Sequence, residues 1–258
     1  MDLVVALDLP TTEENLLLAQ SLLSEQEGEL KPLDCWLKVG LNTFVAGGPS
    51  FVTELKNLGF RIVLDLKLYD IPNTCETAAL RIAELGVEMF TVHASAGVQA
   101  LMGMSHVLKK IENAPKMLAV TVLTSFGHEG CSRIYKQDCD LTVDTLVAEA
   151  VNGLADGVVC SVLDVGKIDQ LQIQTLDRRG GQPKFIKFCP GIRLEDTADD
   201  QKRKGGLYEA LMGGADFVVV GRPIYQAENP AEVAQKIVAK IKDMESKLDA
   251  FRQASKWE

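Results

Sequence analysis

The sequence predicts an α/β fold, a single (β/α)8 TIM barrel that spans residues 1–258. Three observations favour this fold. Short apolar runs rich in β-branched residues occur eight times, and each is followed by a segment in which apolar residues repeat at helical spacing. The runs are almost continuously hydrophobic, which is typical of parallel strands covered by helices. No linker or low-complexity stretch divides the chain, and its length of 258 residues suits one barrel.

The eight repeats place the elements in order along the chain. The expected strands are residues 4–9, 35–39, 61–66, 89–93, 117–123, 157–162, 184–188 and 216–220. The expected helices are residues 11–27, 50–58, 74–85, 98–111, 142–154, 166–176, 206–212 and 230–248. A Rossmann-like or flavodoxin-like open sheet is the alternative, but the first strand–helix turn (residues 8–11) lacks the glycine fingerprint of a dinucleotide site.

Local signals agree with these boundaries. Thr11 or Thr12, followed by Glu14, is suited to cap the first helix. The loops at residues 126–141 and 190–206 have no obvious role in the core, and they follow strand ends, where barrels of this kind bind substrate. We therefore expect these two loops to be mobile lids.

Composition limits the partners and the compartment. The net charge is −9, which argues against nucleic-acid and acidic-membrane binding, because both need an extended basic face. The six cysteines form no CxxC pair and the three histidines no HxxxH pair, so we expect reduced thiols and no zinc site. The N-terminus has no signal-peptide pattern, and no apolar run reaches the length of a membrane span. The sequence therefore predicts a soluble, cytoplasmic protein.

Charged residues of alternating sign are expected along one rim of the barrel. Asp65 and Lys67 point to the same side of their strand, because side chains alternate with a period of two. Asp8 ends the first strand, Lys38 ends the second, and Asp70 lies just beyond Lys67. Opposite charges at close range keep each other ionised near neutral pH. Such an array suits stabilisation of a developing carbanion, with Lys67 as the proton donor.

Simpler interpretations of these residues remain open. Asp65 and Lys67 can form a structural ion pair that lines the barrel, since burial of either charge without a partner is costly. Lys38 alone would be an ordinary solvated strand end. His93, at the end of the fourth strand, fits a hydrogen-bonded core histidine better than an acid–base group.

An anion site is expected between the last two strand ends. Pro190-Gly191-Ile192-Arg193 follows the seventh strand, and Gly221-Arg222-Pro223-Ile224 follows the eighth. Barrels commonly bind phosphate between these two loops, where glycine lets backbone N–H groups approach the oxygens. Arg193 and Arg222 can add bidentate hydrogen bonds.

At these residues the sequence resembles the orotidine 5′-monophosphate decarboxylase family. The family is marked by a DxKxxDIPNT segment, and residues 65–74 read DLKLYDIPNT. The resemblance spans nearly the whole chain, through Ala6-Leu7-Asp8, Leu37-Lys38-Val39-Gly40, Thr91-Val92-His93-Ala94, Leu123-Thr124-Ser125, Asp156-Gly157-Val158-Val159-Cys160-Ser161, Pro190-Gly191-Ile192-Arg193, Asp200-Gln201-Lys202-Arg203 and Gly221-Arg222-Pro223-Ile224. It implies decarboxylation of orotidine 5′-monophosphate to uridine 5′-monophosphate and carbon dioxide, the last step of de novo pyrimidine nucleotide synthesis, with neither cofactor nor metal.

The resemblance also implies roles for the charged residues. Asp8 and Lys38 would hold the ribose hydroxyls, and Lys38 would also pair with Asp65. Asp65 would lie against the substrate carboxylate, and Lys67 would protonate C6 as carbon dioxide leaves. Asp70 would reach into the active site of a second subunit, which makes the enzyme a homodimer with composite sites.

Further substrate contacts follow from the same resemblance. Ile71 would pack near the departing carboxylate, and Thr74 would join Asp70 in the shared site. Thr124 and Ser125 would bind the pyrimidine edge. The remaining contacts, mostly to the phosphate, would come from Pro190, Arg193, Gln201, Gly221 and Arg222. Gln201 belongs to the loop after the seventh strand, whose closure would exclude water.

Two rival interpretations and three departures from the family pattern complete the prediction. Magnesium-dependent 3-keto-gulonate 6-phosphate decarboxylases and hexulose 6-phosphate synthases share the barrel and a DxKxxD segment, but they carry an acidic metal ligand at the position of Lys38. A non-catalytic phosphate-binding barrel would be expected to lose members of the charged set, and all are present. Cys189, Asp164 and residues 42–44 differ from the usual family residues, and none is a charged catalytic position.

Overall fold

The structure, a computed structural model, describes residues 1–26, 28–176, 185–192 and 205–254. In this part of the chain, eight parallel strands form a closed barrel in the order β1-β10-β9-β8-β7-β6-β5-β4. This confirms the predicted (β/α)8 barrel. The barrel strands are β1 (Asp2–Leu7), β4 (Cys35–Gly40), β5 (Ile62–Leu68), β6 (Met89–His93), β7 (Lys116–Val120), β8 (Gly157–Val159), β9 (Ile186–Cys189) and β10 (Phe217–Val220).

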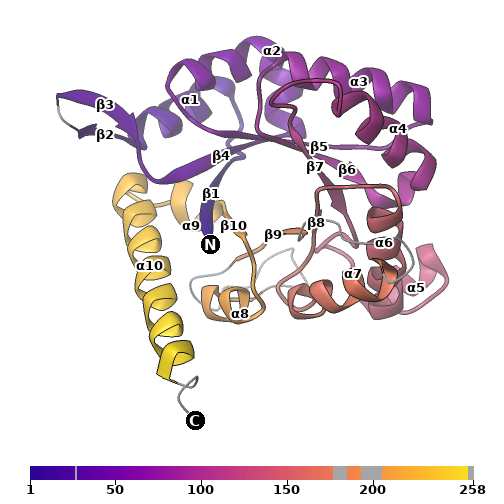
Figure 1. The fold of residues 1–258 in the computed structure, drawn as a ribbon. Coiled ribbons are helices and arrows are strands. Elements are labelled where there is room, and N and C mark those ends of the chain that lie inside the picture. The colour runs from indigo at the N-terminus through magenta and orange to yellow at the C-terminus, as the bar shows by residue number, and fades with distance from the viewer. Residues whose placement is uncertain (27, 177–184, 193–204, 255–258) are drawn as a thin grey trace.

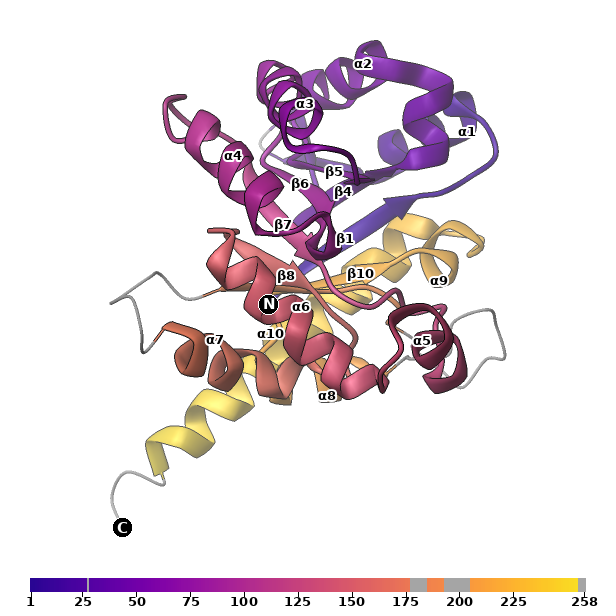
Figure 2. The ribbon, with the colours of Figure 1, turned by 90° about the vertical axis from the view of Figure 1, so that its right-hand side faces the viewer.

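Helices lie around the outside of the strands (Figure 1 and Figure 2). Thr11 caps α1 as predicted, since its hydroxyl accepts from Glu14 N–H while the Glu14 carboxylate accepts from Thr11 N–H. The described α-helices are α1 (Thr12–Ser21), α2 (Leu41–Asn57), α3 (Pro72–Glu84), α4 (Val98–Leu108), α5 (His128–Tyr135), α6 (Cys139–Asn152), α7 (Ile168–Leu176), α8 (Leu207–Met212), α9 (Arg222–Tyr225) and α10 (Pro230–Ala254).

Two apolar layers follow from the alternation of side chains along each strand. On β1, Val4 and Ala6 point into the barrel, whereas Leu3, Val5 and Leu7 pack against the helices. The other buried residues of the interior cluster are Trp36, Val63, Met89, Leu118, Val120, Val159, Phe188 and Val219. On β5, Val63 belongs to the interior and Leu64 to the helix-facing core, so the next inward position is Asp65, as predicted.

The structure corrects three predictions made from the sequence. The predicted helix 11–27 ends at Ser21, and the chain continues as an antiparallel hairpin of β2 (Leu23–Gln26) and β3 (Glu29–Pro32), which projects from the barrel (Figure 1). The predicted helix 50–58 begins at Leu41, because α2 kinks at Gly48 and Pro49 instead of starting there. The loop at residues 126–141, which we expected to be a mobile lid, contains α5. Cys131 of this helix is fully buried, so that part of the loop belongs to the core.

The last helix covers the barrel next to β1. Ala234, Ile237 and Ile241 are buried there, and the C-terminal end of α10 extends beyond the other elements (Figure 2). No helix in the described ranges is both long enough and apolar enough to cross a membrane.

Candidate active site

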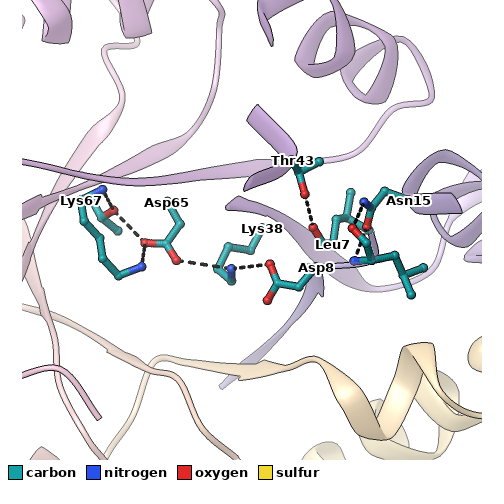
Figure 3. A network of polar contacts seen from close by, with 9 residues as sticks. Leu7, Asp8, Asn15, Lys38, Thr43, Asp65 and Lys67 are labelled. Atoms are coloured by element: carbon teal, nitrogen blue, oxygen red, sulfur yellow. Dashed lines mark hydrogen bonds and ion pairs between the residues drawn. The ribbon is translucent and has the colours of Figure 1, made fainter. Parts of the chain in front are cut away.

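Four charged side chains form a continuous row at the carboxyl ends of β1, β4 and β5 (Figure 3). Lys38 Nζ lies 3.2 Å from Asp8 Oδ1 and 3.3 Å from Asp65 Oδ2. Lys67 Nζ lies 2.8 Å from Asp65 Oδ1. The charges therefore alternate along the row in the order Asp8, Lys38, Asp65, Lys67, as the sequence predicted.

The two inner members of the row are buried and the two outer ones are open. The side chains of Lys38 and Asp65 are 9% and 11% exposed, whereas those of Asp8 and Lys67 are 46% and 36% exposed. Burial alone disfavours both inner charges, but their neighbours outweigh it. Despite its burial, the pKa of Asp65 is lowered to about 2 by the ammonium groups of Lys38 and Lys67 and by hydrogen bonds from Lys67 and Thr91. The pKa of Lys38 is raised despite burial by the carboxylates of Asp65 and Asp8.

Gly40 makes room for the first pair of the row. It ends β4 two residues after Lys38 and therefore faces the barrel interior. A Cβ atom at Gly40 would lie 3.0 Å from Asp8 Oδ1 and 3.3 Å from Lys38 Nζ. A side chain at position 40 would therefore need Asp8 or Lys38 to shift by a few tenths of an ångström, and glycine allows their close approach without such a shift.

A bulge in β5 presents Lys67. The β5–β6 ladder pairs Leu64 with Phe90 and then Leu68 with Val92, so residues 65–67 face the single residue Thr91. Lys67 sits in this bulge with a φ of 51°, a left-handed conformation that costs about 1–2 kcal/mol for a residue with a side chain. Strain of this kind persists only where its surroundings hold it.

Thr91 connects the bulge to the charged row. Its fully buried hydroxyl accepts a hydrogen bond from Lys67 N–H at 2.9 Å and donates one to Asp65 Oδ1 at 2.8 Å. The sequence analysis gave Thr91 no role. The signal that points to it is its place two residues after Met89, because Met89 faces the barrel interior and strand side chains alternate.

The backbone on both sides of Asp8 is also fixed by buried polar side chains that the sequence analysis missed (Figure 3). Thr43 Oγ1 donates to Leu7 O at 2.7 Å. Asn15 Nδ2 donates to Leu9 O at 2.9 Å, and Asn15 Oδ1 accepts from Leu9 N–H at 3.0 Å. Asp8 is half exposed, but the turn that carries it is held in one conformation.

A cavity of about 250 Å³ lies over the charged row. Eight of the predicted site residues line it: Asp8, Lys38, Asp65, Lys67, Thr124, Pro190, Gly221 and Arg222. The cavity thus extends from the charged row to the ends of β9 and β10, where the sequence predicted an anion site. Gly191, which also lines it, has a φ of 81°, a conformation that favours glycine. The lining also includes the apolar side chains of Val120, Val159 and Phe188.

Other predicted site residues do not line this cavity. Asp70, Ile71, Thr74 and Ser125 are not among its lining residues, and Asp70 Oδ1 accepts from Ile71 N–H at 2.7 Å. Within one chain, these four residues are therefore not part of the cavity over the charged row. Arg193 and Gln201 lie outside the described residues.

His93 and the cysteines are further titratable residues of the described chain. His93 is half buried with its ring edge-to-face against Tyr69, and burial together with the Lys67 charge lowers the pKa of His93, against the effect of Asp65. All six cysteines are buried free thiols. The hydrogen bond with Cys189 and burial raise the pKa of Cys160 well above its usual value, which keeps that thiol protonated.

The row combines a fixed negative charge with an adjacent proton donor. Asp65 stays ionised far below neutral pH, and the Lys67 ammonium touches it at the open end of the row. A reacting atom held in the cavity beside Lys67 would meet a donor already in position. Groups of three or more His, Cys, Asp and Glu side chains arranged to hold a metal ion are absent from the described residues.

Known proteins resemble this chain over nearly its whole length. The orotidine 5′-phosphate decarboxylase of a Nitratiruptor species is 46% identical over 244 residues, which cover 93% of this chain and 100% of that protein. The orotidine 5′-phosphate decarboxylase of Campylobacter concisus is 41% identical over 243 residues, with the same two coverages. A crystal structure of orotidine 5′-phosphate decarboxylase from Lactobacillus acidophilus superposes with a TM-score of 0.74 at 32% identity, covering 93% of this chain and 98% of that one.

A family model agrees with these relatives. It is described as orotidine 5′-phosphate decarboxylase / HUMPS, and it matches residues 1–237. That match includes the whole charged row and both loops of the predicted anion site. The chain belongs to the orotidine 5′-phosphate decarboxylase / HUMPS family.

Proposed function

We propose that this protein decarboxylates orotidine 5′-monophosphate to uridine 5′-monophosphate and carbon dioxide, with neither metal nor cofactor. The observation that carries the proposal is the row Asp8–Lys38–Asp65–Lys67 at the base of a cavity that reaches the ends of β9 and β10. The relatives named above carry the same activity in their names.

The chemistry follows from Asp65 and Lys67, which lie next to each other in the row. Loss of carbon dioxide leaves an electron pair on C6 of the pyrimidine, and a proton must replace the carboxyl group there. Asp65 is held ionised, so a substrate carboxylate next to it is repelled until carbon dioxide leaves. The Lys67 ammonium stabilises the developing negative charge and donates its proton to C6.

The rest of the cavity suits a nucleotide. Asp8 and Lys38 offer an acceptor and a donor to the ribose hydroxyls, and Thr124 offers a hydroxyl to the pyrimidine edge. Gly221 and Arg222, with Pro190 beside them, line the far end, where a phosphate would be bound. Arg193 and Gln201 are assigned to the phosphate by the family resemblance alone.

We further propose that the active unit is a homodimer. Asp70, Ile71 and Thr74 belong to the sequence segment that marks the family, yet all three are exposed in one chain. Tyr69 and Ile71, on either side of Asp70 in the sequence, are 65% and 67% exposed and offer apolar surface for a partner to cover. A second copy of the chain that covers this segment would bury these side chains and bring Asp70 to the partner's row.

Lys38 separates this proposal from magnesium-dependent members of the barrel superfamily. Those enzymes need an acidic ligand at this position, and an ammonium group would repel a divalent cation. The test is the loss of orotidine 5′-monophosphate absorbance in the presence of excess EDTA. Turnover unaffected by EDTA is the expected result, and a requirement for added magnesium would overturn the metal-free proposal.

A further inference from the structure

We propose that Thr91 is a positioning residue of this active site, which fixes both the conformation of Lys67 and the direction of the Asp65 carboxylate. The inference rests on the proposed function, because it concerns the geometry in which Lys67 donates its proton. Thr91 is not among the residues that line the cavity, so we assign it no contact with a bound substrate.

The backbone contact is the first observation. Residues 65–67 of β5 face only Thr91 of β6, so the regular ladder cannot supply a carbonyl partner for every N–H group of the bulge. Lys67 N–H instead donates to the Thr91 hydroxyl at 2.9 Å. This bond holds the residue whose φ of 51° is unfavourable without such support. The direction in which the Lys67 side chain leaves the backbone therefore depends on Thr91.

The side-chain contact is the second observation. The Thr91 hydroxyl has one proton, and it donates that proton to Asp65 Oδ1 at 2.8 Å. The same oxygen accepts from Lys67 Nζ at 2.8 Å, while Asp65 Oδ2 faces Lys38 Nζ at 3.3 Å. Asp65 is thus held from three sides, and Thr91 is the one uncharged group among these three.

The Thr91 hydroxyl therefore connects the Lys67 backbone to the Asp65 carboxylate, which the Lys67 side chain also contacts. Valine has nearly the shape of threonine but neither donor nor acceptor. Thr91→Val should therefore leave Lys67 N–H without its acceptor and remove one of the two hydrogen bonds to Asp65 Oδ1, while keeping the core filled. Serine keeps the hydroxyl and loses only a methyl group. The pair of variants separates hydrogen bonding from packing.

The experiment compares steady-state kinetics of the full-length protein with orotidine 5′-monophosphate. Thr91→Val is expected to lower kcat about 30-fold or more with KM changed less than about threefold, because the contacts concern the proton donor rather than binding. Thr91→Ser is expected to stay within about threefold of the wild type in both constants. Thr121→Val is the matched control, since Thr121 is also buried on the barrel and its hydroxyl donates to Val159 O at 2.9 Å without touching the charged row.

The outcomes separate the two proposals. A wild-type protein without decarboxylase activity overturns the proposed function and this inference with it. An active wild type whose kcat survives Thr91→Val, or falls equally in Thr121→Val at the same loss of thermal stability, overturns the role of Thr91 alone. Should Thr91→Val not fold, Thr91→Cys replaces it, because a thiol fills the site but hydrogen-bonds weakly. Thr91→Cys with wild-type kcat would equally contradict the role.

Discussion

Lys38 and Asp65 form a buried ion pair, with 3.3 Å between Lys38 Nζ and Asp65 Oδ2, and each has a further partner of opposite charge at the edge of the cavity. An isolated buried pair contributes little to stability, because desolvation offsets its attraction. In the row each inner charge has two partners, which explains why burial neutralises neither group. The pair therefore holds charge in place for the chemistry at the open ends.

Removal of Lys38 should damage catalysis more than its effect on stability explains. Lys38→Met leaves Asp65 buried with one ammonium fewer, so we expect a stability loss of about 3 kcal/mol and a fall in kcat/KM of about 100-fold or more. Lys187→Met is the control, because Lys187 is also buried and is paired with Asp169 at 2.7 Å, away from the charged row. Similar stability losses with kcat/KM reduced by Lys38→Met alone would support the account, whereas equal kinetic losses would contradict it.

The low pKa of Asp65 predicts how stability depends on pH. Because the folded-state pKa is about 2 and the reference value is 3.8, ionised Asp65 contributes to stability above about pH 4, and this contribution is lost as the pH falls through about 2. The shift corresponds to a contribution on the order of 2 kcal/mol. Denaturant unfolding of the wild type and Asp65→Asn at pH 7, 4 and 3 measures it. The stability difference should be constant down to about pH 4.5 and then change in favour of the Asn variant. A difference that is the same at pH 7 and pH 3 would contradict the assignment.

Complementation tests whether Asp70 acts across a dimer interface. Lys67→Ala and Asp70→Ala proteins should each be nearly inactive. In a mixed dimer with composite sites, one site carries both changes and the other carries neither. Random exchange of subunits should therefore restore about one quarter of wild-type activity. Mass spectrometry of differently tagged subunits verifies the exchange, and no recovery after verified exchange would exclude Asp70 from the partner's site.

The turn that carries Asp8 provides a prediction on binding. Asn15 is fully buried and makes hydrogen bonds to the N–H and the carbonyl of Leu9, so Asn15→Ala should cost about 2–3 kcal/mol of stability. A mobile Asp8 should raise KM severalfold and leave kcat within about threefold, because Asp8 is assigned to the ribose and not to C6. Gln172→Ala serves as the control, since Gln172 Oε1 accepts from Phe185 N–H away from the cavity. A fall in kcat with unchanged KM would contradict this assignment.

The fold and the charged row followed from the sequence because each depends on simple periodicity. The period of two placed Asp65 and Lys67 on one side of β5, and neighbouring strands brought Asp8 and Lys38 to the same rim, as the ion pairs show. The hairpin at β2 and β3 was missed because its residues continue the helical spacing of α1, although Gly28, with a φ of 82°, marks the turn.

The contacts that hold the charged row in place could not be predicted from periodicity. A left-handed lysine has no sequence signature, since the conformation of Lys67 depends on a register shift between two strands. The alternation along β6 predicts that Thr91 faces the barrel interior. Its role depends on its hydrogen bonds to Lys67 and Asp65, which the sequence does not show. Asn15 is separated from Leu9 by a cap and a helical turn, and its contacts depend on how α1 packs.

The most direct test of the proposed proton donor is a crystal structure of the protein with uridine 5′-monophosphate bound. The account predicts that Lys67 Nζ lies within about 3.5 Å of pyrimidine C6 and still contacts Asp65, with the phosphate beside Gly221 and Arg222. A uridine ring bound elsewhere, or a Lys67 ammonium directed away from C6 while the row is intact, would contradict it.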